Sequence, residues 1–476
     1  MPMDNSKPCF FVGVGGSGMM PLAMILAARG ATVAGSDRSL DQARLPAKFA
    51  YLRDLGVELF AQDGSGVVSA DQVVIASAAI EATVPDMLAA ERLGCERRSR
   101  AEMLAQLFND SRLPIGVAGT SGKSTVTGMI GWILHACRRD PTVMNGAVMK
   151  NFATANAPFA SALVGGGDAF VSEVDESDGS IALFSPRVAV LNNVSLDHKS
   201  LEELRQLFGD FIAKADAAII NLDDDEGAQL AERLAPGSVT TFGLTSEADL
   251  TARDIVEHPF GVSFTLVARG QDPVPVELLV PGRHNVANAL AAIAAVRNAR
   301  VSLEEAAIAI GGFTGLRRRF ELAGQANGIT VVDDFGHNPD KIAATLRTLH
   351  AFPGRVLVLF QPHGYGPLKA MRRELVDAFA SGMKAQDMLI LPDPAYFGGT
   401  VAREVTSADI AADIVAAGRD ARHIADRTEA AALIAEIANP GDRVIVMGAR
   451  DDTLSQVAND ILATLASRAS SGAPNG

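Results

Sequence analysis

The seven residues from Gly119 to Thr125, GTSGKST, have the types and spacing that hold nucleotide phosphates. They follow the apolar run LPIGVA and precede the helical segment VTGMIGWIL, so we expect a loop between a strand and a helix. Glycines let successive backbone N–H groups point into one hollow, Lys123 reaches the β- and γ-phosphates, and Ser124 offers a hydroxyl to Mg²⁺. The spacing is two residues shorter than a full Walker pattern, whose first glycine would fall at Val117. We interpret the segment as a phosphate loop rather than a capped glycine turn.

A second glycine-rich segment, GVGGSG from Gly13 to Gly18, follows the apolar FFV and opens another predicted helix. Asp37 ends the next predicted strand, 19 residues after Gly18, as in a dinucleotide-binding turn. Such a turn binds a pyrophosphate of any origin, so NAD, FAD and a UDP-sugar are all candidates. The glycines would also be needed if they only allowed the helix to pack tightly on the sheet.

Two polar clusters follow apolar runs near the phosphate loop. In the first, EVDESD, a period of two places Glu173 and Asp175 on one strand face. The second begins at the end of the run VAVLNN and holds Asn192, Asn193, Asp197 and His198. Carboxylates and an imidazole beside a phosphate loop are suited to divalent metals that bridge phosphate oxygens. We therefore predict a metal site, although without the phosphate loop these charges would indicate a solvated face.

Four histidines lie in polar loops after apolar segments: His198, His284, His337 and His363. Loop histidines after strands suit nucleotide or transition-state contacts, and the alternative is an ordinary surface position. Three arginines, at positions 317–319, stand at a predicted domain junction and would stabilise a transferring phosphate or form a solvated hinge.

These segments stand at the ends of apolar runs that alternate with helical stretches, which indicates a parallel α/β protein. The first runs are FFVGV, TVAGS and VVIAS, and the last are ITVVDD, RVLVLF, DMLILP and RVIVMG. Helices are expected over residues 19–29, 47–55, 340–349 and 368–379. A length of 476 residues allows about three domains, which we place at residues 1–110, 111–312 and 313–476, the last with a disordered tail.

The composition argues against several partners and compartments. A net charge of -14 repels nucleic acid and anionic bilayers, so we expect neither as a partner. Three widely spaced cysteines give no disulfide framework or zinc ribbon and favour the cytoplasm. One uncharged run, from Cys9 to Ala28, has the length of a membrane span, but its glycines and Pro21 favour a buried strand, a turn and a packed helix.

In this order the motifs resemble the Mur ligase family, ATP-dependent ligases that join an amino acid or peptide amine to a UDP-N-acetylmuramyl carboxylate. The resemblance runs from Phe10 to about Leu465 and rests on VGVGGSGMMPLA, RAEML, EVDESD, VPGRHNVANALAA, RRRFE, DDFGHNP, FQPH and MGA. Within the family these motifs are most similar to those of alanine-adding ligases, and next to those of murein-tripeptide recycling ligases. The resemblance implies a Rossmann-like UDP-binding domain, a central phosphate-loop ATPase domain and a mobile Rossmann-like C-terminal domain. It also implies ATP and Mg²⁺ as cofactors, with UDP-N-acetylmuramate, or a related UDP-sugar, and an amino acid or peptide as substrates.

The resemblance further implies roles for individual residues. Those around the uridine diphosphate would be Gly15, Gly16, Ser17, Gly18, Asp37 and Ser77. Those at the ATP phosphates would be Gly122, Lys123, Ser124 and Thr125, and those near Mg²⁺ would be Ser124, Glu173 and His198. Those at the nucleoside would be His284, Asn285 and Asn288, which face the adenine, and Asp334 at the ribose. Upon closure, Arg319 would reach the phosphate, and His337 and His363 would lie on the acceptor side.

The implied reaction transfers the ATP γ-phosphoryl group to the sugar's carboxylate, and the amine then attacks the acyl phosphate. Such transfer needs positioning and charge neutralisation, and a closing domain would exclude water. Two rival functions are a nicotinamide-dependent oxidoreductase, which leaves the phosphate loop unexplained, and a non-catalytic nucleotide-binding protein. We expect Lys123→Ala to remove activity while sparing the fold, because a loop lysine should contribute little to packing.

The sequence departs from the alanine-adding pattern mainly on the acceptor side. Ser121 stands where His is usual in the phosphate loop, and Phe335 and His337-Asn338 replace Tyr with paired His-His. After Gln-Pro-His, Gly364 to Pro367 (GYGP) replace Arg-Tyr-x-Arg, whose arginines would hold an amino acid's carboxylate. We therefore expect that free L-alanine is not the preferred acceptor.

Overall fold

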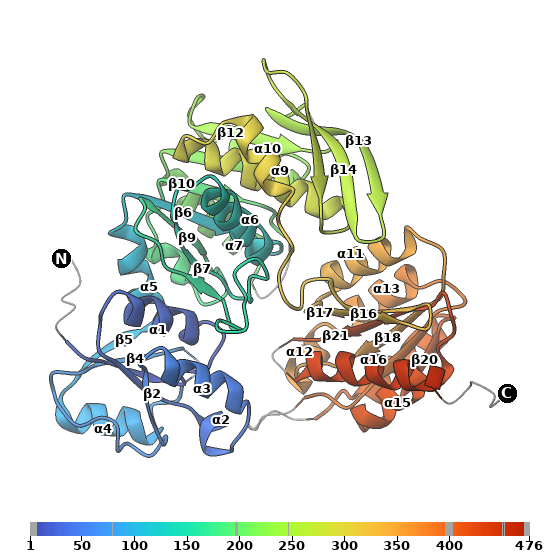
Figure 1. Cartoon of the computed structure of the whole chain (residues 1–476), viewed down its shortest axis with the longest axis horizontal. Helices are drawn as coiled ribbons and strands as arrows, with labels where there is room; N and C mark the ends of the chain where they lie inside the picture. Colours follow the sequence, from blue (N-terminus) through green and yellow to red (C-terminus); the bar gives the residue numbers. More distant parts are fainter. Residues whose placement is uncertain are drawn as a thin grey trace. The chain divides into compact units, whose positions relative to one another are not determined.

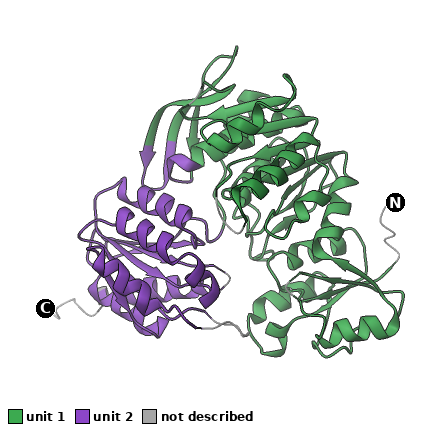
Figure 2. Ribbon diagram, turned by 180° about the vertical axis from the view of Figure 1, so that it is seen from behind, with its two compact units in different colours: residues 1–256, 263–279, 285–316 green, residues 257–262, 280–284, 317–476 purple. Residues whose placement is uncertain are grey.

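The computed structural model describes residues 7–78, 80–195, 199–245, 247–395, 403–449, 451 and 453–470. Within them the chain forms three sheets of mainly parallel strands with helices between the strands, so the predicted α/β class is confirmed (Figure 1). Two compact units are distinguished, the first with residues 1–256, 263–279 and 285–316 and the second with 257–262, 280–284 and 317–476 (Figure 2). The first unit contains the first sheet and the second sheet except for residues 257–258 and 261–262, which belong to the second unit. The domain boundaries placed at residues 110 and 312 stay a prediction.

The first sheet has the strand order β3-β2-β1-β4-β5, and all its neighbouring strands are parallel. Its strands are β1 (Cys9–Val12), β2 (Val33–Ser36), β3 (Glu58–Phe60), β4 (Val73–Ala76) and β5 (Glu96–Ser99). Its helices are α1 (Met19–Ala28), α2 (Arg38–Asp41), α3 (Pro46–Asp54), α4 (Pro85–Leu93) and α5 (Arg100–Asn109). The strand order reverses between β1 and β4, where open α/β sheets bind their ligands. The glycine turn follows β1, and Ser77 follows β4.

The uncharged run from Cys9 to Ala28 forms β1, the glycine turn and α1, as the sequence predicts. Both elements are buried because β1 lies in the middle of the sheet and α1 packs eight buried residues, Met19 to Leu26, into the core. None of the helices in the described ranges has the length and apolarity required to cross a bilayer.

The second sheet has the order β15-β14-β13-β12-β11-β10-β6-β9-β7-β8. Its strands are β6 (Leu113–Ala118), β7 (Thr142–Met144), β8 (Ala162–Leu163), β9 (Ala169–Glu173), β10 (Val188–Leu191), β11 (Ala217–Asn221), β12 (Val239–Gly243), β13 (Leu250–His258), β14 (Gly261–Ala268) and β15 (Val274–Leu278). Its helical segments are α6 (Lys123–Ala136), η1 (Ser180–Leu183), α7 (Leu201–Ala213), α8 (Asp225–Ala231), α9 (Arg283–Val296), η2 (Arg297–Ala299) and α10 (Leu303–Ile310). The central strands are apolar because both faces are covered, one of them by α7, which buries Phe208 and Phe211.

Strand β6 pairs in parallel with β10 on one side and with β9 on the other. Parallel neighbours end at the same edge of a sheet, so the segments after these three strands meet there. They are the phosphate loop after β6, the asparagines after β10, and the acidic cluster that begins at the end of β9. The fold thus brings together three motifs, the first and last of which are about 70 residues apart in the sequence.

The third sheet has the order β16-β17-β21-β18-β19-β20, with β16 antiparallel to β17 and the other pairs parallel. Its strands are β16 (Glu321–Ala326), β17 (Ile329–Asp334), β18 (Val356–Phe360), β19 (Met388–Leu391), β20 (Asp420–His423) and β21 (Arg443–Met447). Its helices are α11 (Pro339–His350), α12 (Tyr365–Ala370), α13 (Arg372–Gly382), α14 (Ser407–Ala416), α15 (Arg427–Ile437) and α16 (Leu454–Ser470). The helix predicted over residues 368–379 is instead divided at Met371, between α12 and α13.

Candidate active site

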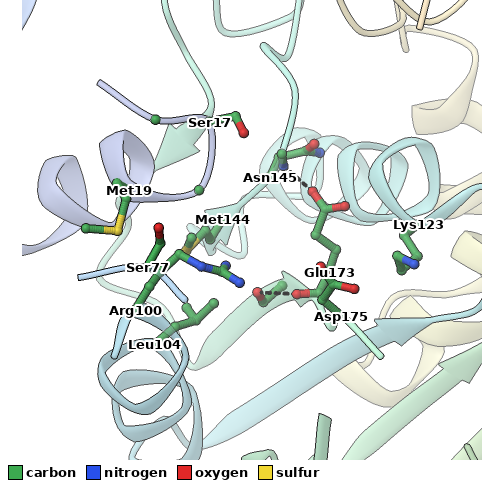
Figure 3. A pocket seen from close by; sticks show the side chains of 14 residues that line it. Ser17, Met19, Ser77, Arg100, Leu104, Lys123, Met144, Asn145, Glu173 and Asp175 are labelled. Carbon is green, nitrogen blue, oxygen red and sulfur yellow. Dashed lines mark hydrogen bonds between the residues drawn. The ribbon is translucent and has the colours of Figure 1, made fainter. Parts of the chain in front are cut away.

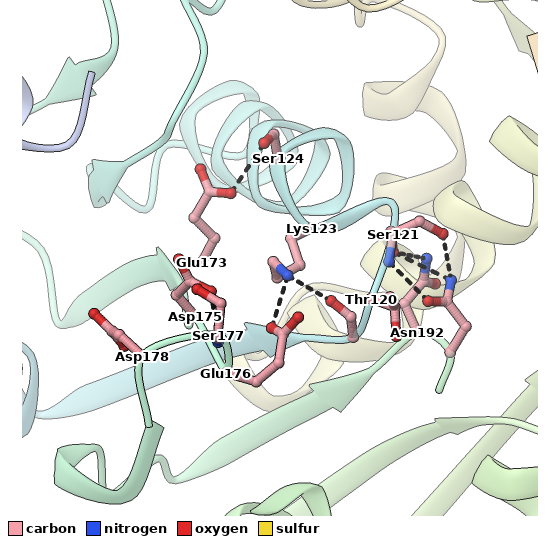
Figure 4. Close-up of polar contacts among 12 residues, drawn as sticks. Thr120, Ser121, Lys123, Ser124, Glu173, Asp175, Glu176, Ser177, Asp178 and Asn192 are labelled. Carbon is pink, nitrogen blue, oxygen red and sulfur yellow. Dashed lines mark hydrogen bonds and ion pairs between the residues drawn. The ribbon is translucent and has the colours of Figure 1, made fainter. Parts of the chain in front are cut away.

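The phosphate loop runs from β6 to the first turn of α6 and can be built only with glycine at its key positions (Figure 4). Gly122, which precedes α6, has a left-handed φ of +83°. A Cβ on it would lie 2.3 Å from Asn192 Nδ2 and 2.8 Å from Asn288 Oδ1. Gly119 has φ +130°, and a Cβ there would approach the backbone of Asn193 to 3.0 Å. The loop is therefore held tightly against the end of β10 and against α9.

Lys123 lies in the loop with its ammonium group already bonded (Figure 4). Its Nζ donates to the carbonyl oxygen of Gly119 at 2.7 Å and to Glu176 Oε2 at 2.8 Å. Both side chains are largely buried, with 17% of the lysine and 6% of the glutamate exposed. Burial lowers the pKa of Lys123, but the neighbouring carboxylates, Glu176 foremost, together outweigh burial, and the net pKa is raised. The sequence gives this lysine little packing value, but its bond to a buried carboxylate leads us to expect a contribution to stability as well.

Ser124 and Glu173 place two oxygen donors beside Lys123. The Ser124 hydroxyl donates to Glu173 Oε2 at 2.9 Å, and the backbone N–H of Gly146 donates to the other carboxylate oxygen. Strand β9 ends at Glu173, so Asp175 lies in the following loop and not on the predicted strand face. Burial raises the pKa of Asp175, but the charge of Lys123 and the hydrogen bonds from Ser177 together outweigh burial, and the net pKa is below its usual value.

The asparagines after β10 fix the back of the loop. The backbone N–H of Ser121 donates to Asn193 Oδ1 at 2.8 Å, and Asn193 Nδ2 donates to the Ser121 hydroxyl at 3.0 Å. Asn192 Nδ2 donates to Asn288 Oδ1 at 3.0 Å, and Asn288 Nδ2 donates to Asn285 Oδ1 at 3.1 Å. The structure thus joins Asn285 and Asn288 to the phosphate loop through Asn192.

One pocket joins the glycine turn of the first sheet to the phosphate loop of the second (Figure 3). Its volume is about 360 Å³, within the range of small-molecule sites. From the first sheet it is lined by Gly16, Ser17, Gly18, Met19, Ser77, Arg100 and Leu104. From the second it is lined by Lys123, Met144, Asn145, Gly146, Ser172, Glu173 and Asp175. The glycine turn and the phosphate loop, which are far apart in the sequence, therefore line the same pocket.

Gly15 and Asp37, although predicted with this group, lie just behind the pocket rather than in its lining. Asp37 accepts hydrogen bonds from the backbone N–H groups of Gly15 at 2.9 Å and of Ser39 at 2.8 Å. Its carboxylate is mostly buried and caps α2. The structure gives Asp37 a part in holding the glycine turn in shape.

The third sheet gathers a separate set of predicted residues at the carboxyl ends of β17 and β18. The rings of His337 and His363 are 5.2 Å apart, and the Arg319 guanidinium lies 4.3 Å from the centre of the Phe335 ring. His337 Nδ1 lies 2.9 Å from the carbonyl oxygen of Phe335, which can only accept, so Nδ1 carries the proton. Burial, with the nearby charge of Lys341, places the pKa of His337 well below its usual value, and the ring is neutral at pH 7.

Asp334 ends β17 with both carboxylate oxygens bonded. They accept from the backbone N–H of Phe320 at 3.1 Å and from the Thr345 hydroxyl at 2.7 Å. His284 belongs to the same unit, and Asp334 acts on it electrostatically, so these two predicted nucleoside contacts come together. Asn285 belongs to the other unit.

The segment that departs from the alanine-adding pattern begins at Gly364 and continues into α12. The basic residues that follow it already have acidic partners. Lys369 pairs with Glu404, Arg372 Nε lies 2.7 Å from Asp413, and the exposed Arg373 Nε lies 3.9 Å from Asp377. Arg403 lies with its guanidinium carbon 5.2 Å from the centre of the Tyr365 ring.

Of the predicted site residues, His198 lies outside the described residues. Thr125 lies in the first turn of α6, as a phosphate-loop residue should. Sequence reasoning missed Glu176, although it stands within EVDESD, because no periodicity indicates that it turns toward Lys123. It also gave no role to Arg100, whose only signal was its place in the RAEML segment.

Open parallel sheets with a phosphate loop and a glycine turn on one pocket define a nucleotide-dependent α/β enzyme. The chain belongs to the Mur ligase family, whose members are ATP-dependent, amide-forming ligases. Residues 9–112 match the family model described as "Mur ligase family, catalytic domain". Residues 117–296 match the "Mur ligase middle domain", and residues 318–450 match the "Mur ligase, glutamate ligase domain".

Similar proteins span the same length. The UDP-N-acetylmuramate–L-alanine ligase of Geobacter sp. strain M21 is 36% identical over 92% of this chain and 94% of its own. That of Streptomyces coelicolor is 36% identical over 95% and 96%. The structure of UDP-N-acetylmuramate-alanine ligase from Thermotoga maritima has a TM-score of 0.79 and 23% identity, covering 98% of this chain and 100% of that one. A murein peptide ligase structure from Psychrobacter arcticus has a TM-score of 0.70 and 23% identity, covering 97% and 99%.

Proposed function

We propose that this enzyme joins an amino acid to the carboxylate of UDP-N-acetylmuramate with ATP as energy source. The observation that carries the proposal is the shared pocket, in which the glycine turn after β1 and Lys123 line the same space. A UDP-sugar acid with its diphosphate at the turn would present its carboxylate to the phosphate loop. The alanine ligases of similar sequence support this substrate.

In the proposed reaction the chain's residues position charge rather than form covalent bonds. Lys123 would leave Glu176 to neutralise the transferring phosphate, while the N–H groups of the loop hold the other phosphate oxygens. Arg319, from the turn before β16, would complete this set upon closure. On the acceptor side, the neutral His337 would accept a hydrogen bond from the attacking amine at Nε2, because its Nδ1 is bonded to Phe335.

The oxygen donors beside Lys123 fit Mg²⁺. Ser124 and Glu173 supply a hydroxyl and a carboxylate 2.9 Å apart, which are hard ligands. In the described part of the chain no three His, Cys, Asp or Glu side chains gather as a metal site, so the remaining ligands would be phosphates and water, as Mg²⁺ prefers. Bound Mg²⁺ would supply charge neutralisation at the phosphates.

The test of the function is product formation. Incubation with UDP-N-acetylmuramate, Mg²⁺-ATP and a panel of amino acids and short peptides should release ADP and yield a product whose mass is the sum of sugar and acceptor minus water. ATP hydrolysis without such a product for every acceptor would contradict the proposal. A peptide as the only acceptor would instead support the recycling-type alternative.

We predict that Glu173→Gln raises the Mg²⁺ concentration needed for half-maximal turnover by about tenfold, because the carboxylate loses its charge toward the ion. His198 should act in the same way, and its alanine variant belongs in the same titration. Asp178→Asn is the matched control, since Asp178 is in the same segment but does not line the pocket. An unchanged Mg²⁺ requirement in both site variants would assign these side chains to a solvated face.

We also predict that free L-alanine is not the preferred acceptor. Gly364 and Gly366-Pro367 supply no cation for its carboxylate, and the loss of one charge-assisted bond weakens binding by about 10- to 100-fold. The basic residues that follow are engaged with acidic partners, which limits compensation. Saturation kinetics over the acceptor panel would decide the question, and the prediction fails if L-alanine gives the highest kcat/KM.

A further inference from the structure

Arg100 stands where the glycine turn and the acidic cluster face the same pocket (Figure 3). It is the first residue of α5, whose start is fixed by a capping box between Ser99 and Glu102. Its side chain lies against Gly18, where an added Cβ would be 3.0 Å from Arg100 Cδ and 3.2 Å from Nη1. The guanidinium therefore extends along the glycine turn because residue 18 has no side chain.

The charge of Arg100 has no close acidic partner among the residues that the structure describes. By contrast, Lys123, the other cation in the pocket lining, is bonded to Glu176. The charge of Arg100 is felt by Asp175 across the pocket, although no ion pair forms between them. A half-buried guanidinium in this position is suited to an anionic ligand with two or more oxygens.

The glycine turn supplies further donors next to this charge. Within the described ranges, the backbone N–H groups of Ser17 and Gly18 donate no hydrogen bond, whereas those of Gly15, Gly16 and Met19 do. Gly18 precedes α1, whose first turn holds no acidic residue that would oppose an anion. Free N–H groups, a helix N-terminus and a guanidinium thus converge on one region of the pocket.

We propose that Arg100 binds the diphosphate of the nucleotide-sugar substrate and holds it against the glycine turn. The inference rests on the proposed function and adds a substrate-binding residue to it. The diphosphate is favoured over the sugar's carboxylate because Arg100 lies along Gly18, whereas Lys123 and Glu173 are on the opposite side of the pocket. Arg100 would thereby hold the diphosphate, which does not react, away from Lys123, where the reacting carboxylate of the same substrate would lie.

The test measures binding of UDP, uridine and UDP-N-acetylglucosamine by calorimetry to the full chain. In Arg100→Gln the Kd for UDP and for UDP-N-acetylglucosamine should rise by about 10- to 100-fold, since a charge-assisted bond to phosphate is lost. Affinity for uridine, which has no phosphate, should stay the same and report an intact fold. Arg100→Lys keeps the charge without the guanidinium fork, so its Kd for UDP and for UDP-N-acetylglucosamine should lie between those of the unchanged protein and of Arg100→Gln.

The matched control is Arg97→Gln, because Arg97 is exposed on β5 and does not line the pocket. Its affinity for all three ligands should equal that of the unchanged protein. The inference is overturned if Arg100→Gln binds UDP and UDP-N-acetylglucosamine with the affinity of the unchanged protein. If the unchanged protein forms no amide product but Arg100→Gln still loses UDP affinity, the proposed reaction fails and the diphosphate site stands.

Discussion

Lys123→Ala should abolish ligase activity and also lower the stability of the protein. Removal of a charge that stabilises a transferring phosphate reduces kcat by at least about 10²- to 10³-fold. The same change leaves Glu176, a buried carboxylate, without its partner at 2.8 Å. An unpaired buried polar group costs about 1–3 kcal/mol, and more when it is charged. Turnover and thermal melting of the variant should therefore both fall.

A double variant separates these two effects. Lys123→Met with Glu176→Gln removes both charges and keeps similar side-chain volumes, so most of the lost melting temperature should return. Activity should not return, because the phosphate still lacks its cation. Substantial ligase activity in either lysine variant would refute the assignment of the loop, and a melt unchanged in Lys123→Ala would show that the ion pair contributes little to stability.

Gly122→Ala should be the second most damaging change. A side chain at φ +83° costs about 1–3 kcal/mol of backbone strain. The new Cβ would also meet Asn192 Nδ2 at 2.3 Å and disturb its bond to Asn288. The loop must then move, and a shift of about 1 Å in positioned phosphate donors reduces turnover by about 100-fold. We expect a raised KM for ATP together with a lower kcat.

Gly56→Ala provides the matched control. Gly56 has the same φ of +83°, but no atom lies within 4 Å of the position of an added Cβ. Gly56→Ala should lower the melting temperature because of backbone strain, and it should keep full activity. Equal activity of the two alanine variants would show that the close contact with the asparagines has no effect on the loop.

Strands and helices with strong periodicity could be predicted from the sequence. The strand predicted from LPIGVA is observed as β6, and ITVVDD forms β17 over the same residues, because buried parallel strands are continuous apolar runs. Strand β20, with the sequence DARH, carries no such signal because it lies at a sheet edge and exposes three of its four residues. The long strand β13 lies between β14 and β12 rather than at an edge, but it is polar over most of its length, so no continuous apolar run indicates it.

The site was predictable where a motif has local geometry and not where it depends on tertiary approach. GTSGKST identified Lys123 and Ser124 because a loop between strand and helix determines their positions. The partner of Lys123 could not be selected among the four acidic residues of EVDESD, since the choice depends on how the chain turns after β9. Arg100 reaches the glycine turn only because β5 lies next to β4 and places the start of α5 near that turn.

The bond between Lys123 and Glu176 also bears on product release. Ligation leaves orthophosphate in a site built for phosphoryl groups, where an unpaired lysine would retain it. Here the carboxylate competes for the ammonium, so a lone phosphate or sulfate must displace a neighbouring group before it gains full Coulomb energy. A nucleotide has additional contacts through its base and ribose that offset this cost, whereas an inorganic anion has none. The enzyme should therefore release the orthophosphate product readily and resist inhibition by inorganic phosphate in solution.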